Sequence, residues 1–338
     1  MVKKIICGVV ALFVISGIGA YFYVGNYFYN FALRRGTKWD SALDFKMPDI
    51  PIEEQNRTLQ DKGDNAKLRE RVELRRRQSF IRFAQARKWF EVSRYEDVYI
   101  RSYDELRVHA YKIEHSGSSR WVVFAHGYCA DASDLFVEAK NFYERGYNVL
   151  LLDMRGHGKS DGNYMGMGWH DRLDIKEWVK YLVDNDKNCS IVLFGVSMGA
   201  AAVMMSVGED LPNNVKVAIE DCGYTSIADE VNYLIGTMFG LPAWPIVTSA
   251  SIVTKMRAGF FVGDGSCINQ LKKSKTPILF IHGAADKFVP TRMVNELYDA
   301  ACAPKEKLII EEATHRISSQ VNFDLYWKTV WEFVEKYV

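Results

Sequence analysis

The chain has 338 residues, of which 48% are hydrophobic and 25% charged, which is typical of one large globular domain with an appendage. Its 43 basic and 42 acidic side chains leave a net charge of +1, so no overall field draws it to nucleic acid. The six cysteines stand singly, with no C-x-x-C pair or metal-ligand spacing, so we expect neither a metal centre nor a bound cofactor.

The first segment is apolar and stands apart from the rest of the chain. No charged residue occurs from Ile5 to Leu33, and the core from Ile5 to Val24 is long enough to span a bilayer. A cleaved signal peptide is the alternative, but residues 17–20 make a poor cleavage site. We therefore expect residues 1–35 to form an uncleaved single-pass anchor in the cell membrane, with the main domain on the extracytoplasmic side. Basic residues flank the apolar stretch on both sides, so they do not settle this orientation.

Residues 36–95 are expected to form a linker and a basic helical segment. Prolines and mixed polar residues indicate an extended linker up to about residue 60. The stretch from Lys67 to Lys88 then contains nine basic and two acidic residues. One interpretation is a basic amphipathic helix that touches anionic headgroups. The other is a solvated helix whose apolar residues pack on the main domain, and we favour it because such charge runs are commonly solvated faces.

From Glu96 onward the pattern predicts strands that alternate with helices. Apolar and polar residues alternate across 98–101 and 107–113, which indicates an antiparallel hairpin at a sheet edge. Short buried strands are then expected at 121–125, 148–152, 191–194, 215–219, 277–281 and 307–311. Amphipathic helices between them predict a mostly parallel central sheet with helices on both faces.

The loop after strand 148–152 ends in Gly158-Lys159-Ser160, which is part of the signature of a phosphate-binding loop. The full signature requires a glycine where this chain has Asp153, so the sequence argues against nucleotide binding. Two histidines nearby, His109 and His126, are interpreted as structural, and His126 suits bracing a loop at a strand end.

The stretch Gly195-Val196-Ser197-Met198-Gly199 joins a buried strand to an alanine- and methionine-rich helix. A serine on such a sharp turn stands clear of the sheet, and the flanking glycines allow the strand and helix backbones to approach closely. The backbone N–H of Met198 then lies at a helix N-terminus, where it can stabilise an oxyanion. A second donor is expected just after strand 121–125, at the backbone N–H of Tyr128.

Two further strands end in residues that complete a catalytic set. Asp286 follows strand 277–281, and His315 follows strand 307–311, so the order is nucleophile, acid, base along one edge of the sheet. A serine hydroxyl needs a neutral imidazole to take its proton, and the imidazole needs a carboxylate to orient it. Asp221 also ends a strand and is the alternative acid.

Residues 225–265 are longer than a simple connection requires. Apolar residues at helical spacing, followed by an aromatic tract, suggest a helical cap over the serine, although an ordinary helical hairpin gives the same periodicity. Under the cap interpretation, Tyr128, Phe239 and Trp244 are tentative substrate-binding residues.

Residues 96–338 resemble the α/β-hydrolase superfamily, and most of all its serine esterase, monoglyceride-lipase and serine-aminopeptidase branch. The resemblance rests on five motifs: His126-Gly127, Asp153-x-Arg155-Gly156-x-Gly158-x-Ser160, Gly195-x-Ser197-x-Gly199, Gly283-x-x-Asp286 and His315. It implies an α/β-hydrolase fold with Ser197 as nucleophile, His315 as base, Asp286 as orienting acid, and Met198 and Tyr128 as oxyanion donors. The apolar segment in front of the domain resembles the anchors of bacterial surface-associated hydrolases of this type.

These observations favour a membrane-anchored serine hydrolase of the carboxylesterase or lipase type, which cleaves an ester or thioester of a small-molecule or lipid-like acyl substrate. A serine aminopeptidase is the enzymatic alternative, and it needs a carboxylate that holds an α-amino group, for which Glu220 is the candidate. A catalytically silent, anchored binding protein is the third. The sequence leaves the oligomeric state open.

Overall fold

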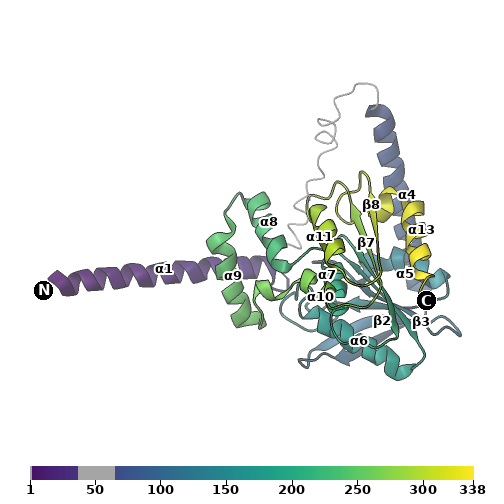
Figure 1. Cartoon of the computed structure of the whole chain (residues 1–338), viewed down its shortest axis with the longest axis horizontal. Helices are drawn as coiled ribbons and strands as arrows, with labels where there is room; N and C mark the ends of the chain where they lie inside the picture. Colours follow the sequence, from purple (N-terminus) through teal and green to yellow (C-terminus); the bar gives the residue numbers. More distant parts are fainter. Residues whose placement is uncertain (1, 37–64) are drawn as a thin grey trace.

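The computed structural model describes the backbone of residues 2–36 and 65–338 and the side chains of residues 16–36 and 70–338. Within these ranges an eight-stranded sheet forms the centre of the molecule, in the order β1-β2-β4-β3-β5-β6-β7-β8 (Figure 1). The strands are β1 Tyr95–Arg101, β2 Arg107–Ile113, β3 Arg120–Ala125, β4 Asn148–Asp153, β5 Ser190–Val196, β6 Val215–Asp221, β7 Ile278–Gly283 and β8 Lys305–Ile310.

The sheet is antiparallel only at one edge. Strand β2 pairs antiparallel with β1 and with β4, whereas every other pairing, from β4 through β8, is parallel. Valine, leucine and isoleucine fill the central strands because both faces are covered, as is usual for parallel sheets. The carboxyl ends of six parallel strands therefore meet at one edge, where loops can bring distant residues together.

Helices cover both faces of the sheet and enclose two separate apolar cores. One core is covered by α4 Asn65–Val92, α5 Phe136–Glu144 and α13 Phe323–Val334. The other is covered by α6 Asp171–Asn185, α7 Met198–Ser206, α10 Cys267–Leu271 and α11 Arg292–Ala300. Short helical turns complete the description: η1 Ala132–Leu135, η2 Val262–Asp264 and α12 Ser318–Val321. The predicted mostly parallel sheet with helices on both faces is confirmed.

Two helices, α8 Ile227–Phe239 and α9 Ala243–Ala258, are inserted between β6 and α10. The Ser226 hydroxyl caps the start of α8 by accepting a hydrogen bond from the Asp229 N–H at 3.0 Å. Gly240 ends the helix in the left-handed conformation, with φ at 62°. The pair stands outside the sheet layers and lies over the end of α1 (Figure 1). These helices lie in the range where the sequence suggests a cap.

Helix α1, Val2–Ala32, projects from the domain, and its last turns pack on α9 (Figure 1). Residues 5–15 of the expected anchor lie outside the side chains that the structure describes. Over the described residues, no helix combines the length and the hydropathy that crossing a bilayer requires.

The basic helix α4 packs its second half on the domain. Ala86 is buried, Trp89 lies 5.4 Å from Tyr143 between ring centroids, and Phe90 stacks on Phe136 at 4.1 Å. Its free end points away from the domain on a different side from α1 (Figure 1). Trp89 and Phe90 thus pack on the main domain, whereas Phe80 and Ile81 of the same helix are exposed. Linker residues 37–64 lie outside the described part of the chain.

Strand β5 and helix α7 are joined by a tight turn at Ser197. Ser197 occupies an unusual backbone conformation, with φ at 57° and ψ at −117°. A Cβ atom on Gly195 would lie 2.2 Å from the Gly199 carbonyl oxygen, and one on Gly199 would lie 2.0 Å from the Ala125 carbonyl oxygen. Only glycine fits at either position, since the obstructing atoms belong to the backbone.

Replacing Gly199 with alanine should therefore lower the free energy of unfolding by at least about 2 kcal/mol, because strand β3 and helix α7 must separate to admit the methyl group. The matched control is Gly236→Ala in helix α8, where a Cβ meets nothing within 4 Å. The control should gain about 0.5–1 kcal/mol from helix propensity. Urea unfolding followed by tryptophan fluorescence measures both, and equal stabilities of the two variants would contradict this description of the turn.

Candidate active site

Three residues that follow different strands meet at the carboxyl edge of the sheet. The Ser197 Oγ lies 2.9 Å from His315 Nε2, and His315 Nδ1 lies 2.8 Å from Asp286 Oδ2. All three side chains are buried. The structure thus brings together the serine after β5, the aspartate after β7 and the histidine after β8 in one continuous hydrogen-bonded chain.

Asp286 is held as an anion by its surroundings. Its Oδ1 accepts hydrogen bonds from the backbone N–H groups of Phe288 and Val289, both at 2.9 Å. Burial opposes ionisation, but hydrogen bonds from His282 and His315 outweigh it and lower the pKa of Asp286 to about 2. The carboxylate is therefore charged at neutral pH.

This charge decides which nitrogen of His315 carries a proton. An ionised carboxylate only accepts hydrogen bonds, so Nδ1 must be the donor to Asp286 and Nε2 is left to accept from Ser197. Burial lowers the pKa of His315 below its usual value, while the hydrogen bond that the ring donates to Asp286 works in the opposite direction. The neutral imidazole is thus the form present at neutral pH.

The two neighbouring carboxyl groups on β6 have other partners. Asp221 Oδ2 accepts a hydrogen bond from the Tyr326 hydroxyl at 2.9 Å, and burial raises its pKa to about 6. Glu220 Oε2 accepts from the Gly223 N–H at 2.9 Å, and burial raises its pKa to about 8. Asp221 is therefore not the partner of His315. Glu220 was wrongly suggested as a pocket carboxylate, because it is fully enclosed beneath the sheet edge and does not line the cavity.

The expected oxyanion donors lie beside Ser197. Met198 is the first residue of α7, so no helical carbonyl is available to its N–H. A Cβ on Gly127 would stand 3.5 Å from the Ser197 Cβ, which places the loop after β3 against the serine. Tyr128 follows in this loop and lines the same cavity as Ser197 and Met198.

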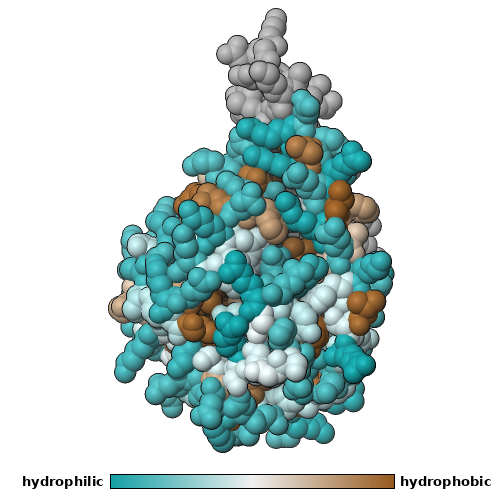
Figure 2. Space-filling model, turned by 90° about the vertical axis from the view of Figure 1, so that its right-hand side faces the viewer, coloured by the Kyte–Doolittle hydropathy of each residue, from teal (hydrophilic) through white to brown (hydrophobic). Residues whose placement is uncertain are grey.

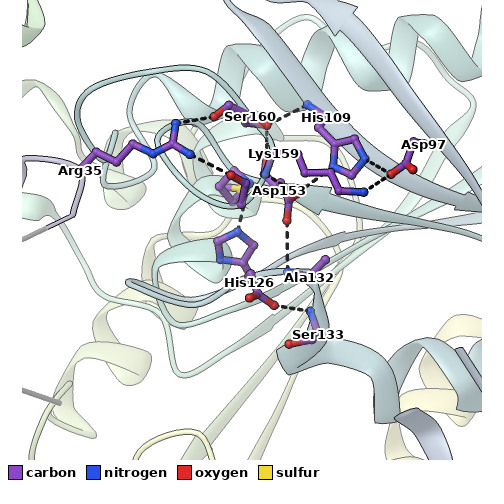
Figure 3. Close-up of polar contacts among 12 residues, drawn as sticks. Arg35, Asp97, His109, His126, Ala132, Ser133, Asp153, Lys159 and Ser160 are labelled. Carbon is purple, nitrogen blue, oxygen red and sulfur yellow. Dashed lines mark hydrogen bonds and ion pairs between the residues drawn. The ribbon is translucent and has the colours of Figure 1, made fainter. Parts of the chain in front are cut away.

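The loop after β4 is held by polar contacts rather than shaped for phosphate (Figure 3). The Asp153 carboxylate accepts from the Lys159 N–H at 2.9 Å and contacts His109 Nδ1 at 2.8 Å. On its other side, His109 Nε2 lies 2.8 Å from Asp97. A Cβ on Gly158 would lie 2.2 Å from the Asp153 carboxyl group, so this carboxylate packs directly on the loop backbone, where its negative charge would repel a phosphate.

The same loop is joined to β3 and to the end of α1 (Figure 3). His126 Nε2 accepts from the Met154 N–H at 3.0 Å, while its Nδ1 donates to the Gly127 carbonyl at 2.8 Å. Burial lowers the pKa of His126, which keeps the ring neutral for both roles. The Arg35 guanidinium donates to the carbonyls of Ser160 at 2.7 Å and Gly158 at 2.8 Å. His126 thus braces two loops and lies outside the catalytic chain.

An apolar cavity of about 970 Å³, including the part open to solvent, adjoins Ser197. Helix α8 contributes six apolar side chains: Ile227, Val231, Leu234, Ile235, Met238 and Phe239. Tyr128 and Phe239, both expected to bind substrate, lie in its wall. Trp244 does not, because it stands at the start of α9 with 76% of its surface exposed.

Two groups of cavity residues escaped prediction from the sequence. The first is Glu230 on α8, which is only 2% exposed and has no hydrogen-bond partner at either carboxyl oxygen among the described residues. Burial raises its pKa well above the usual value. The sequence could have identified Glu230 as a cavity residue, because it lies three residues after Ile227 and therefore on the otherwise apolar face of α8. The second group is the end of α1: Phe28, Tyr29, Phe31, Ala32 and Leu33.

One set of metal-binding residue types occurs in the described part of the chain, formed by Cys222, Asp286 and His315 with ligand atoms within 4.8 Å of one another. Burial raises the pKa of the Cys222 thiol well above its usual value, so it stays protonated and is a poor ligand. Asp286 and His315 are already bonded to each other. The donor set therefore does not suit a metal ion.

Comparison with known proteins gives a consistent result. Residues 117–244 match the family model "Serine aminopeptidase, S33". The uncharacterised protein YqkD of Bacillus subtilis is 26% identical over 229 residues, which cover 68% of this chain and 75% of YqkD. The α/β-hydrolase domain-containing protein WAV2 of Arabidopsis thaliana is 27% identical over 260 residues, covering 72% and 79% of the two chains.

Among solved structures, the Pyrococcus furiosus esterase Pf2001 superimposes with a TM-score of 0.59 and 26% identity, covering 72% of this chain and 92% of the esterase. An esterase from Exiguobacterium antarcticum has 18% identity and a TM-score of 0.55, which shows a shared fold. The fold and these similarities support a member of the α/β-hydrolase superfamily with hydrolase activity.

Proposed function

We propose that the protein is a serine hydrolase that cleaves a carboxylic ester or thioester through an acyl-enzyme on Ser197. The observation that carries the proposal is the chain of hydrogen bonds from Ser197 through His315 to the ionised Asp286, at the wall of an apolar cavity. Nucleophile, base and orienting acid need this arrangement, since serine is a weak nucleophile by itself.

In this mechanism the Ser197 Oγ attacks the acyl carbon while its proton passes to His315 Nε2. The N–H groups of Met198 and Tyr128 stabilise the oxyanion, and Asp286 stabilises the imidazolium. The bond to the leaving group then breaks, and His315 gives the proton to the departing atom. Water, deprotonated by His315, attacks the acyl-enzyme, and the released acid leaves Ser197 with its proton restored.

The surroundings of Ser197 favour an acyl group that is itself apolar. Glu230 is the one acidic side chain among the described residues of the cavity wall, and burial raises its pKa and so favours its neutral form. Burial of a hydrocarbon chain is therefore the main source of binding energy there. Similarity to an esterase supports an ester substrate.

We extend the proposal to the uncharged stretch from Ile5 to Leu33, which would hold the enzyme on the cell membrane with its main domain on the extracytoplasmic side.

A fluorophosphonate probe, which reacts with activated serines, should label the wild-type chain but not Ser197→Ala or His315→Ala. With p-nitrophenyl acetate, Asp286→Asn should lower kcat by about 10⁴-fold, because His315 then holds the wrong tautomer. The matched control Asp221→Asn should stay within about threefold, since that side chain bonds to Tyr326 instead. Absence of labelling in folded wild-type protein would instead favour a silent binding protein.

The pH dependence of kcat/KM should follow the ionisation of His315 in the free enzyme. Only the neutral imidazole accepts the serine proton, and burial lowers the pKa of this ring. Activity should therefore persist as the pH falls to the usual histidine value of about 6.5 and be lost below it. A pH–rate profile with p-nitrophenyl acetate tests this, and a half-maximal rate at pH 7 or above would show that His315 is not held in the neutral form.

The aminopeptidase alternative keeps one specific observation in its favour. Glu230 places a buried carboxyl group without a hydrogen-bond partner among the described residues in the cavity wall, and a substrate ammonium group would both pair with it and restore its ionised form. This residue, rather than Glu220, is the one able to hold an α-amino group.

The variant Glu230→Gln separates the two activities, because glutamine keeps the size of the side chain but never becomes anionic. The measured quantity is the kcat/KM for alanine p-nitroanilide divided by that for p-nitrophenyl acetate. An aminopeptidase should lose about 100-fold in this ratio when its charged partner is removed. The esterase proposal expects the wild type to cleave the ester far faster than the anilide, and the reverse order would overturn it.

A further inference from the structure

The end of helix α1 forms part of the cavity that contains Ser197. Phe28, Phe31 and Ala32 line this cavity together with the serine. The Tyr128 hydroxyl donates a hydrogen bond to the Ala32 carbonyl at 2.6 Å, so the loop expected to supply an oxyanion donor is attached directly to α1. The helix therefore completes the binding site in addition to preceding the domain.

Polar contacts fix α1 in this position along its last turns. The Ser249 hydroxyl on α9 donates to the Tyr21 carbonyl, and Gly25 allows the close approach, since a Cβ there would lie 2.4 Å from the Ser249 oxygen. Farther along, Arg257 donates to the Asn30 side chain at 2.9 Å. These contacts join α1 to the cap as one unit.

The cavity reaches the molecular surface between α1 and α8. Phe239 lies in edge-to-face contact with Phe28 at 5.6 Å and with Phe31 at 5.5 Å between ring centroids. Phe239 and its neighbour Met238 both line the cavity, yet they are 37% and 39% exposed. They therefore stand at its mouth.

The surface around this mouth is uncharged. No charged residue occurs from Val231 to Thr254 in the cap, or from Ile5 to Leu33 in and after α1. The large exposed apolar side chains here define what we call the α1–cap surface: Ile18, Phe22, Tyr23, Tyr27, Met238, Phe239, Leu241 and Trp244. The face of the molecule turned away from α1 is, by contrast, mostly hydrophilic with scattered apolar residues (Figure 2).

Basic residues follow the uncharged stretches of α1 and the cap, where the α1–cap surface meets the rest of the domain. Lys255 and Arg257 lie in the last turn of α9, and Arg34 follows α1. Arg257 donates a hydrogen bond to the Asn30 side chain, which places this cation beside the last turn of α1. An apolar surface bordered by basic side chains is the pattern of a face that enters a bilayer and meets the headgroups at its rim.

We propose that the α1–cap surface lies in a lipid bilayer and that the cavity takes its substrate from it. The substrate class is then a long-chain fatty acyl ester of a membrane lipid, whose chain enters between α1 and α8. This inference rests on the proposed function, because it uses the same serine. It assigns α1 a second role, as the wall against which the acyl chain packs.

The site is tested with the full chain reconstituted in phosphatidylcholine vesicles. The readout is the kcat/KM for p-nitrophenyl palmitate divided by that for p-nitrophenyl acetate. Ala32→Trp fills the cavity and should lower this ratio about tenfold, whereas Phe28→Ala enlarges it and should raise the ratio. The matched control Ala20→Trp, on an exposed turn of the same helix, should leave the ratio within about twofold. Opposite shifts distinguish a chain-binding wall from general damage, and no shift in either cavity variant would overturn the proposal.

The lipid contact is tested separately by fluorescence quenching with brominated phosphatidylcholine. Trp244 is the exposed tryptophan of the α1–cap surface, so Trp244→Phe should remove most of the quenched emission. An equal quenched fraction in wild type and variant would show that the cap does not touch lipid. If the wild type hydrolyses neither ester, the proposed function fails instead, and the quenching result stands independently of it.

Discussion

The backbone conformation of Ser197 is the constraint on which the rest of the site depends. Holding a non-glycine residue at φ 57° and ψ −117° costs on the order of 1–3 kcal/mol. The packing of β5, α7 and β3 around the turn must offset this cost and keep the backbone in that conformation. Gly195 and Gly199 permit this packing, since α7 lies too close to the Ala125 carbonyl for any side chain. The turn directs the Ser197 hydroxyl toward His315 and places the N-terminus of α7, which begins at Met198, beside that hydroxyl.

The second constraint is the distribution of charge among buried carboxyl groups. Burial dominates at Glu220, Asp221 and Glu230 and raises their pKa values, whereas the pKa of Asp286 is lowered to about 2. The difference lies in its partners, two backbone N–H groups and two histidines. Ionised Asp286 sets the tautomer of His315, and that tautomer leaves Nε2 free to accept the serine proton. The edge of the sheet thus holds a permanent anion at Asp286, placed where the imidazole needs it.

The sequence was sufficient for the fold class, since buried strands alternating with amphipathic helices are a strong local signal. The order of Ser197, Asp286 and His315 after successive strands predicted residues that the structure brings together. Asp221 was indistinguishable from Asp286 by the same rule, and only the Tyr326 hydroxyl, 105 positions away, shows that Asp221 is occupied elsewhere. Long-range partners of this kind leave no trace in local periodicity.

The cavity was least accessible to prediction for the same reason. Trp244 belongs to the aromatic tract but faces outward, and the uncharged run of α1 gives no sign that its last turns reach Ser197. These turns contact α9 more than two hundred positions later in the chain. The most direct measurement is a crystal structure of the full chain, grown from a lipidic phase after reaction with hexadecyl fluorophosphonate. The account predicts phosphorus bonded to Ser197 Oγ, its oxygen near the Met198 and Tyr128 N–H groups, and the alkyl chain between α1 and α8. An adduct on another residue, or a chain that leaves the cavity away from α1, would contradict it.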